Sequence, residues 1–142
     1  MIAIAIDDEP IALDIVAAHA SKVPFVELSA QFTNAFDAIT YLQQHKVDLI
    51  FLDIKMPDIS GIDFVKTLSR PPMIIFTTAY SEHAVQSFEL DAVDYLLKPF
   101  AFDRFLTAAE KAAKEKKVRN ATTVQGYLTV RADYKQYRID YA

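Results

Sequence analysis

Five short apolar segments alternate with longer stretches of helical periodicity along the 142-residue chain. Apolar runs of this length predict β-strands. The runs around Ile4, Ile50 and Ile74 are apolar at every position, as in parallel strands whose sheet is covered on both faces. The five predicted strands are Ile2–Ile6, Phe25–Phe32, Leu49–Leu52, Met73–Phe76 and Asp94–Leu97.

Helical patterns fill the stretches between these strands. Pro10 is well placed to begin the first helix, in which Ile11, Ile15 and Ala18 form an apolar stripe. Five strand–helix units in about 120 residues predict a doubly wound α/β domain with a parallel sheet. The other predicted helices run from an Asn34 cap to near His45, from Gly61 to Leu68, from a Ser81 cap through Glu89, and along the stripe Phe102, Phe105, Leu106, Ala109 and Ala113.

The pattern changes after Lys111. Residues 119–126 are interpreted as a linker, and residues 127–142 alternate with period two around a plausible turn at Ala132-Asp133. An isolated hairpin is marginal in water, so this short β-rich tail is expected to open a second domain that the chain does not complete. The predicted division is therefore a first domain over 1–118, a linker over 119–126 and an incomplete domain over 127–142.

Composition narrows the class of protein. The chain is 52% hydrophobic, which suffices for a substantial core. It has no apolar run near the ~20 residues of a membrane span, and its N-terminus lacks the basic region of a secretory signal. The absence of cysteine excludes disulfides and thiolate zinc sites and fits a cytoplasmic protein. With a net charge of −4, the chain lacks the overall positive charge that is typical of nucleic-acid-binding domains.

Candidate chemistry lies where the predicted strands end. Asp53 ends the third strand, and Asp7 and Asp8 end the first. In a sheet of order 2-1-3-4-5 these two strands flank the point where strand order reverses, so the three carboxylates converge. Like charges about 5 Å apart repel by roughly 3 kcal/mol at an effective dielectric near 20, which favours a bound cation. Oxygen ligands indicate Mg²⁺ or Mn²⁺; the alternative is that Asp7 and Asp8 only cap the first helix.

Two other strand ends face the same edge. Lys98 follows the fifth strand and could pair with Asp53 and hold a phosphoryl oxygen. Thr77 and Thr78 end the fourth strand, and alternation turns one of the two hydroxyls towards the edge. A carboxylate in such a setting can attack phosphorus to give an aspartyl phosphate. With only two glycines, Gly61 and Gly126, the chain has neither a P-loop nor a dinucleotide fingerprint.

Over residues 1 to about 118 the sequence resembles the receiver domains of two-component response regulators, which have a flavodoxin-like fold. The motifs "DD", "LDIKMPDISG", "TTA" and "DYLLKP" carry the resemblance, each at the end of its predicted strand. It implies that Asp53 accepts a phosphoryl group from a sensor histidine kinase. It also implies that Mg²⁺ is bound by Asp8, Asp53 and the backbone carbonyl of Lys55, with Asp7 acting through water.

The same resemblance assigns residues to switching. Thr78 matches the switch threonine and Tyr95 the switch aromatic. The Lys98–Pro99 peptide bond is expected to be cis, so that the lysine faces the acids. Phosphorylation is then expected to promote a homodimer through the face of the fourth helix, fifth strand and fifth helix.

Within that family, residues 74–100 resemble regulators that carry a LytTR-type DNA-binding domain. The tail resembles the first strands of that domain, so the chain is expected to be truncated near its start. DNA binding is therefore expected only through the missing part, and no membrane contact is expected. Phe88 with Val85 is a weaker candidate for a dimer face.

Two other functions are alternatives. One is a Mg²⁺-dependent phosphohydrolase that uses the same acids, but position 55 carries a lysine where haloacid-dehalogenase-type phosphatases keep a general acid. The other is an interaction module with an idle acidic pocket. The receiver is expected to be no enzyme beyond its own phosphorylation and dephosphorylation. His19, His45 and His83 fall on three predicted helices and are interpreted as surface residues.

Overall fold

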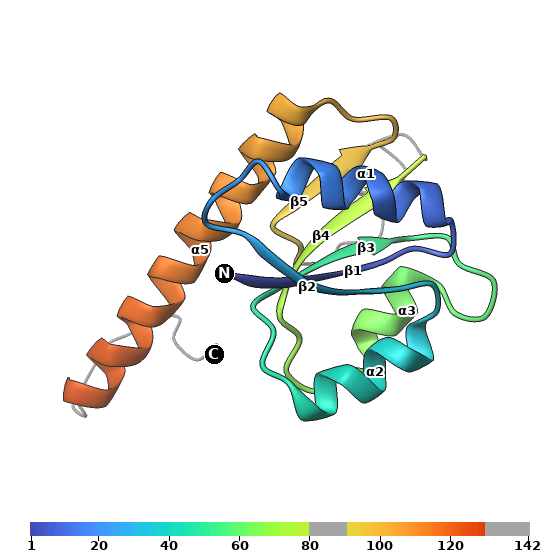
Figure 1. Ribbon diagram of the computed structural model, residues 1–142. Helices are drawn as coiled ribbons and strands as arrows, with labels where there is room; N and C mark the ends of the chain where they lie inside the picture. Colours follow the sequence, from blue (N-terminus) through green and yellow to red (C-terminus); the bar gives the residue numbers. More distant parts are fainter. Residues whose placement is uncertain (80–90, 130–142) are drawn as a thin grey trace.

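The computed structural model describes residues 1–79 and 91–129, with the backbone alone described over 121–129. Its centre is a five-stranded, all-parallel sheet in the order β2-β1-β3-β4-β5 (Figure 1). This confirms the predicted doubly wound α/β sheet and its order. The strands are β1 (Ile2–Ile6), β2 (Glu27–Phe32), β3 (Leu49–Asp53), β4 (Met73–Thr78) and β5 (Asp94–Leu97).

Helices cover both faces of the sheet. Helices α1 (Pro10–Ala20) and α5 (Phe102–Thr129) lie on one face, and α2 (Ala35–Gln44) and α3 (Gly61–Lys66) on the other (Figure 1). The helix predicted from Ser81 through Glu89, with Phe88 and Val85, lies outside the described residues. The covered faces explain why β3 and β4 are buried at every position.

Side-chain alternation along the strands builds two hydrophobic cores. Phe51 points to the face of α1 and α5, where it stacks on Phe105 with ring centroids 5.0 Å apart. Its neighbours Ile50 and Leu52 point to the face of α2 and α3. Because β3 contributes to both cores, its last residue, Asp53, is held from both sides.

The buried face of α1 differs from the predicted one. Ile11 and Ile15 of the expected stripe are 73% and 41% exposed, and the residues that enter the core are Leu13, Val16 and Ala20. The helix, PIALDIVAAHA, carries apolar side chains on nearly every side, so periodicity alone does not select one face. The consequence is a pair of isoleucines at the surface.

The C-terminal part of the chain also departs from the prediction. Helix α5 continues to Thr129, through residues 119–126, which were expected as a linker, and into the start of the predicted β-rich tail. The linker contains no proline, and its least helix-favouring residue, Gly126, costs only about 1 kcal/mol relative to alanine, so nothing local stops the helix. Residues 130–142 lie outside the described part, and the division into domains stays a prediction. Over the described residues, no helix has the length and hydrophobicity needed to span a bilayer.

Candidate functional site

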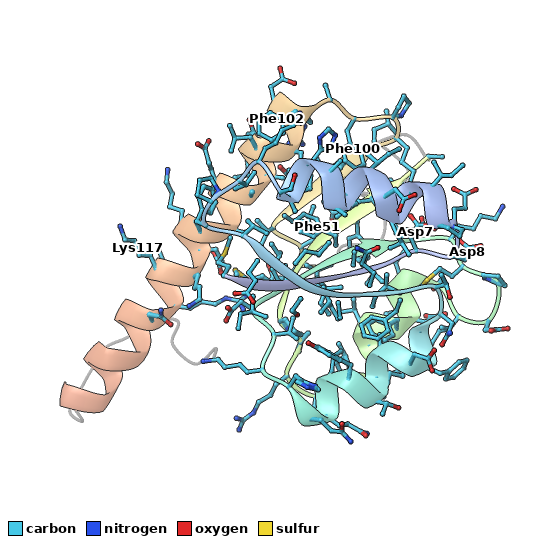
Figure 2. The ribbon with its side chains drawn as sticks, viewed as in Figure 1. Asp7, Asp8, Phe51, Phe100, Phe102 and Lys117 are labelled. Atoms are coloured by element: carbon cyan, nitrogen blue, oxygen red, sulfur yellow. The ribbon has the colours of Figure 1, made fainter. Side chains whose placement is uncertain are left out.

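Three carboxylates meet at the carboxyl edge of the sheet, as predicted. One oxygen from each of Asp7, Asp8 and Asp53 can be chosen so that all three lie within 4.8 Å of one another. Asp7 and Asp53 are buried and Asp8 is half-buried. Figure 2 shows Asp7 and Asp8 together beyond the end of β1. The positions follow from topology, because β1 and β3 are neighbours and both end at this edge.

Lys98 brings a positive charge to the same place. Its Nζ lies 2.8 Å from Asp7 Oδ2, 3.6 Å from Asp53 Oδ1 and 3.9 Å from Glu9 Oε1. The backbone N–H of Lys98 donates to the carbonyl oxygen of Thr78 at 2.7 Å, which fixes the end of β5 against β4. The Lys98–Pro99 peptide bond is cis, the conformation expected from the sequence.

Asp7 has partners on both carboxylate oxygens. Lys98 bonds Oδ2, and the backbone N–H of Glu9 donates to Oδ1 at 3.0 Å. Both oxygens of Asp7 are therefore already engaged by protein groups. The atoms that could ligate a metal here are all carboxylate oxygens. Mg²⁺ and Mn²⁺ prefer oxygen ligands, so the residues present fit such an ion.

The local charges perturb Asp53 strongly. Burial raises its pKa from 3.8 to about 7, aided by repulsion from Asp7 and Asp8. The Lys98 ammonium and a hydrogen bond from the Lys55 backbone N–H act in the opposite direction without reversing the shift. For Lys98, burial lowers the pKa, but the hydrogen bond to Asp7 and the charge of Asp53 outweigh burial and raise it. Lys98 is therefore charged at neutral pH. The positive charge around Asp53 is too small to offset its burial and the repulsion from the neighbouring acids.

The loop after β3 is held close to Asp53. Ser60 caps α3 by accepting a hydrogen bond from the Asp63 N–H, and the Gly61 N–H donates to the Ile54 carbonyl at 2.7 Å. A Cβ at residue 61 would overlap the backbone carbonyl oxygen of Asp53. Glycine is therefore required by this close approach, and the turn fixes where Asp53 lies.

The structure separates the two threonines. Both are buried at the end of β4, but Thr78 lines a cleft of about 570 Å³ together with Asp8, Asp53 and Lys98. Thr77 instead lines a groove of about 620 Å³ between α1 and the segment that follows β5. Of the two threonines, Thr78 therefore shares a cleft with Asp53, and it is the residue that the resemblance selects.

Tyr95 lies beneath this edge. Its half-buried ring stacks on Phe76, with centroids 5.7 Å apart, and packs against the core that α2 and α3 cover. Burial raises the pKa of its hydroxyl, and the charge of Asp91 adds to the shift.

Lys55, whose backbone carbonyl is an expected metal ligand, has an exposed side chain beside the cleft.

Two polar clusters were not predicted. Asp94, at the start of β5, is buried and receives hydrogen bonds from both terminal nitrogens of Arg104 at 2.8 Å, with Lys111 at 3.2 Å. His19 is not a surface residue as interpreted, because its ring is half-buried among phenylalanines. His45 is exposed as expected, and His83 lies outside the described residues. No sequence pattern links His19 to Phe100, its hydrogen-bond partner 81 residues away.

With this fold and acidic edge, the chain belongs to the response regulator receiver domain family, whose model matches residues 3–110. Receiver domains are signalling modules of two-component systems that bind Mg²⁺ at an acidic pocket. They work with sensor histidine kinases and often dimerise.

Its relatives include LytTR-type regulators. The sensory transduction protein LytT of Bacillus anthracis is 37% identical over 114 residues, which cover 78% of this chain and 46% of that protein. The transcriptional regulatory protein LytR of Staphylococcus aureus is 35% identical over 94% of this chain and 56% of its own length. The chain thus spans about half the length of these curated relatives.

A solved structure supports the same assignment. The response regulatory domain of protein mrkE from Klebsiella pneumoniae is 34% identical and superposes with a TM-score of 0.71. The match covers 81% of this chain and 97% of that domain.

Proposed function

We propose that this chain receives a phosphoryl group on Asp53 from a phosphohistidine of a sensor histidine kinase. The observation that carries the proposal is the Asp53 carboxylate, buried between two other acids and one lysine with its pKa raised to about 7. A carboxyl group that served only the fold would have partners that favour its charge. Perturbed groups of this kind cluster at functional sites.

The proposed reaction is an in-line transfer. A carboxylate oxygen of Asp53 attacks phosphorus while the bond from phosphorus to the donor's imidazole nitrogen breaks, and the bonding electrons leave with the imidazole. Asp8, Asp53 and the backbone carbonyl of Lys55 would hold Mg²⁺, with Asp7 acting through water. When bound, the ion supplies positive charge that offsets the acids and the phosphoryl oxygens. Lys98 would hold a phosphoryl oxygen, and its ion pairs with Asp7 and Asp53 keep it beside the reacting carboxylate.

The groove beside the acids suits the kinase partner. It lies between α1 and the residues after Lys98, and Ile11 and Ile15 line it with little cover. An apolar helix seated there would bring its histidine to the edge that holds Asp53. Replacement of Ile11 and Ile15 by serine should lower the rate of transfer from a phosphorylated kinase more than the rate from acetyl phosphate. Equal losses with the two donors would contradict this docking.

Thr78 and Tyr95 are the proposed switch. The Thr78 hydroxyl lies on the cleft that holds Asp53, so a phosphoryl group would attract it and pull its loop inward. Tyr95 would then pack further inward and change the face that pairs two chains. A Thr78→Ala variant should be phosphorylated yet fail to dimerise in sedimentation velocity. A dimerisation response equal to that of the parent would exclude this coupling.

The output is proposed to be transcription, carried by residues beyond this receiver. The similarity to S. aureus LytR extends over 94% of the chain, past the end of the receiver match at residue 110. This favours a tail that begins a LytTR-type DNA-binding domain, in a cytoplasmic regulator whose phosphorylation tunes promoter binding. Gel-shift titrations should show that a protein extended by such a domain binds promoter DNA and that residues 1–120 do not. Equal affinity of the two would exclude this proposal.

Labelling with acetyl phosphate and Mg²⁺, followed by intact mass spectrometry, tests the central proposal. We expect one phosphoryl group per chain, none without the metal, and none on Asp53→Asn. Asp14→Asn, at an exposed position on α1, is the matched control and should label like the parent. Label on the Asp53→Asn variant would exclude Asp53 as acceptor. Catalytic turnover of a generic phosphate ester would favour the phosphohydrolase, which the similarity to receivers does not support.

A further inference from the structure

The position of Lys98 depends on the short loop of residues 98–101, which connects β5 to α5. The start of this loop is fixed by the hydrogen bond from the Lys98 N–H to the Thr78 carbonyl. Its end is fixed where the Phe105 N–H donates to Ala101 at 3.1 Å. Between these points the loop forms one wall of the 620 Å³ groove, so over that length α1 does not pack closely against it. In the middle of the loop, Phe100 packs against the core with its ring centroid 6.3 Å from that of Phe105, and α1 adds one polar contact to it.

His19 supplies that contact from the last turn of α1. Its Nε2 lies 3.3 Å from the carbonyl oxygen of Phe100. Among the described residues this is the one side-chain hydrogen bond that joins α1 to the loop. A carbonyl oxygen can only accept, so Nε2 carries the hydrogen and donates, and the neutral ring keeps a bare lone pair on Nδ1.

That second nitrogen has no partner. Nδ1 of His19 is buried and lacks a hydrogen-bonding group among the described residues. The ring is surrounded by Phe100, Phe102 and Phe105, with centroids 5.3 to 5.8 Å away. A buried polar atom without a partner destabilises the folded chain, and an apolar side chain of similar size would avoid that cost. Packing alone therefore does not account for a histidine, whereas its N–H donor does.

We propose that His19 is a positioning residue for Lys98. By donating to the Phe100 carbonyl, two residues after Lys98, it fixes the loop so that the ammonium group stays between Asp7 and Asp53. The inference rests on the proposed phosphorylation of Asp53. It predicts that the hydrogen-bond donor, and not the bulk of residue 19, controls the rate of that reaction.

A matched pair of substitutions separates donor from bulk. In His19→Gln the side-chain amide can replace the Nε2 donor, whereas His19→Met has nearly the same length and no donor. With acetyl phosphate at saturating Mg²⁺, we expect His19→Met to lower the maximal rate of Asp53 labelling about five- to tenfold, and His19→Gln to stay within about twofold of the parent. The melting temperature of His19→Met should be no lower than that of His19→Gln, because methionine leaves no polar atom buried.

Two further measurements make the outcome decisive. In a Lys98→Ala background the difference between methionine and glutamine should vanish, because the residue that His19 positions is gone. In the unphosphorylated chain, amide hydrogens of residues 100–101 should exchange faster with methionine than with glutamine. Equal labelling rates for the two variants, a difference that persists without Lys98, or equal exchange would each overturn the role of His19. Absence of label on the parent chain would instead overturn the proposed function.

Discussion

The acidic edge around Asp53 and the start of β5 around Asp94 hold two equally buried aspartates in opposite electrostatic settings. Their residues are 6% and 7% exposed. Burial on its own would raise the pKa of Asp94, but hydrogen bonds from Arg104, the Tyr95 N–H and Lys111 outweigh burial and lower it. Asp53 has two acids beside it and a single lysine at 3.6 Å, and its pKa rises to about 7. The neighbouring charges, and not burial, distinguish Asp53 from Asp94, and they support the role proposed for Asp53.

An aspartate-to-asparagine substitution is expected to change the free energy of unfolding in opposite directions at positions 94 and 53. Asp94→Asn keeps the shape of the side chain but leaves Arg104 and Lys111 beside a neutral amide. We expect a loss of about 2–3 kcal/mol in the free energy of unfolding at pH 7, measured by urea denaturation. Asp14→Asn serves as an exposed control and should change stability by less than about 0.5 kcal/mol. A neutral result at position 94 would mean that its ion pairs contribute nothing beyond their own desolvation.

Asp53→Asn is expected to stabilise the chain, by on the order of 2 kcal/mol at pH 8 without metal. The folded pKa lies above the unfolded value of 3.8, so the folded state binds the extra proton and the parent loses stability as pH rises from about 4 to about 7. The advantage of asparagine should therefore shrink towards pH 4.

The pKa of Asp94 is lowered in the folded state. Asp94 therefore contributes to the free energy of unfolding above its unfolded pKa, and this contribution is lost as pH falls through the lowered folded pKa. Urea denaturation of the parent and both variants from pH 4 to pH 8 tests this contrast. If Asp53→Asn and the parent had parallel pH profiles, the repulsion at the acidic edge would be disproved.

Magnesium should produce the smallest effect, again at one place only. At ten times its dissociation constant the ion should stabilise the parent by about 1.4 kcal/mol, seen as a rise in melting temperature. The rise should be much reduced in Asp53→Asn and Asp8→Asn, and should persist in Asp94→Asn. If the rise were lost in Asp94→Asn and kept in Asp8→Asn, the ion would bind at a site other than the acidic edge.

The sequence predicted the acidic edge well because its residues follow the ends of strands, and parallel strands end at one edge. Asp7, Asp8, Asp53, Thr78 and Lys98 came together for that reason. The helices were harder to orient from sequence. An almost wholly apolar α1 left its buried face undetermined, so its exposed isoleucines were not foreseen.

Contacts between residues that are distant in the sequence could not be predicted either. The Arg104 partner of Asp94 depends on how α5 packs beside β5, and the bond from His19 to Phe100 depends on how α1 lies beside the loop. Neither geometry is encoded in a local pattern. The continuation of α5 through residues 119–126 was not predicted because a polar, glycine-containing stretch is typical of a linker.

Helix α5 connects the two edges of the sheet. It begins just after the loop that carries Lys98, and the Nζ of Lys116 lies 3.9 Å from Oδ1 of Asp48, the residue that precedes β3 at the opposite edge. At 1.5 Å per residue, Phe102 and Lys116 are separated by about 21 Å along the axis. A tilt of only 5° at the end near Lys98 would displace Lys116 by about 2 Å over that length. A small tilt at one end of this helix would therefore become a larger displacement at the other, and a pair of spin labels on β2 and on the helix near residue 117 would measure it.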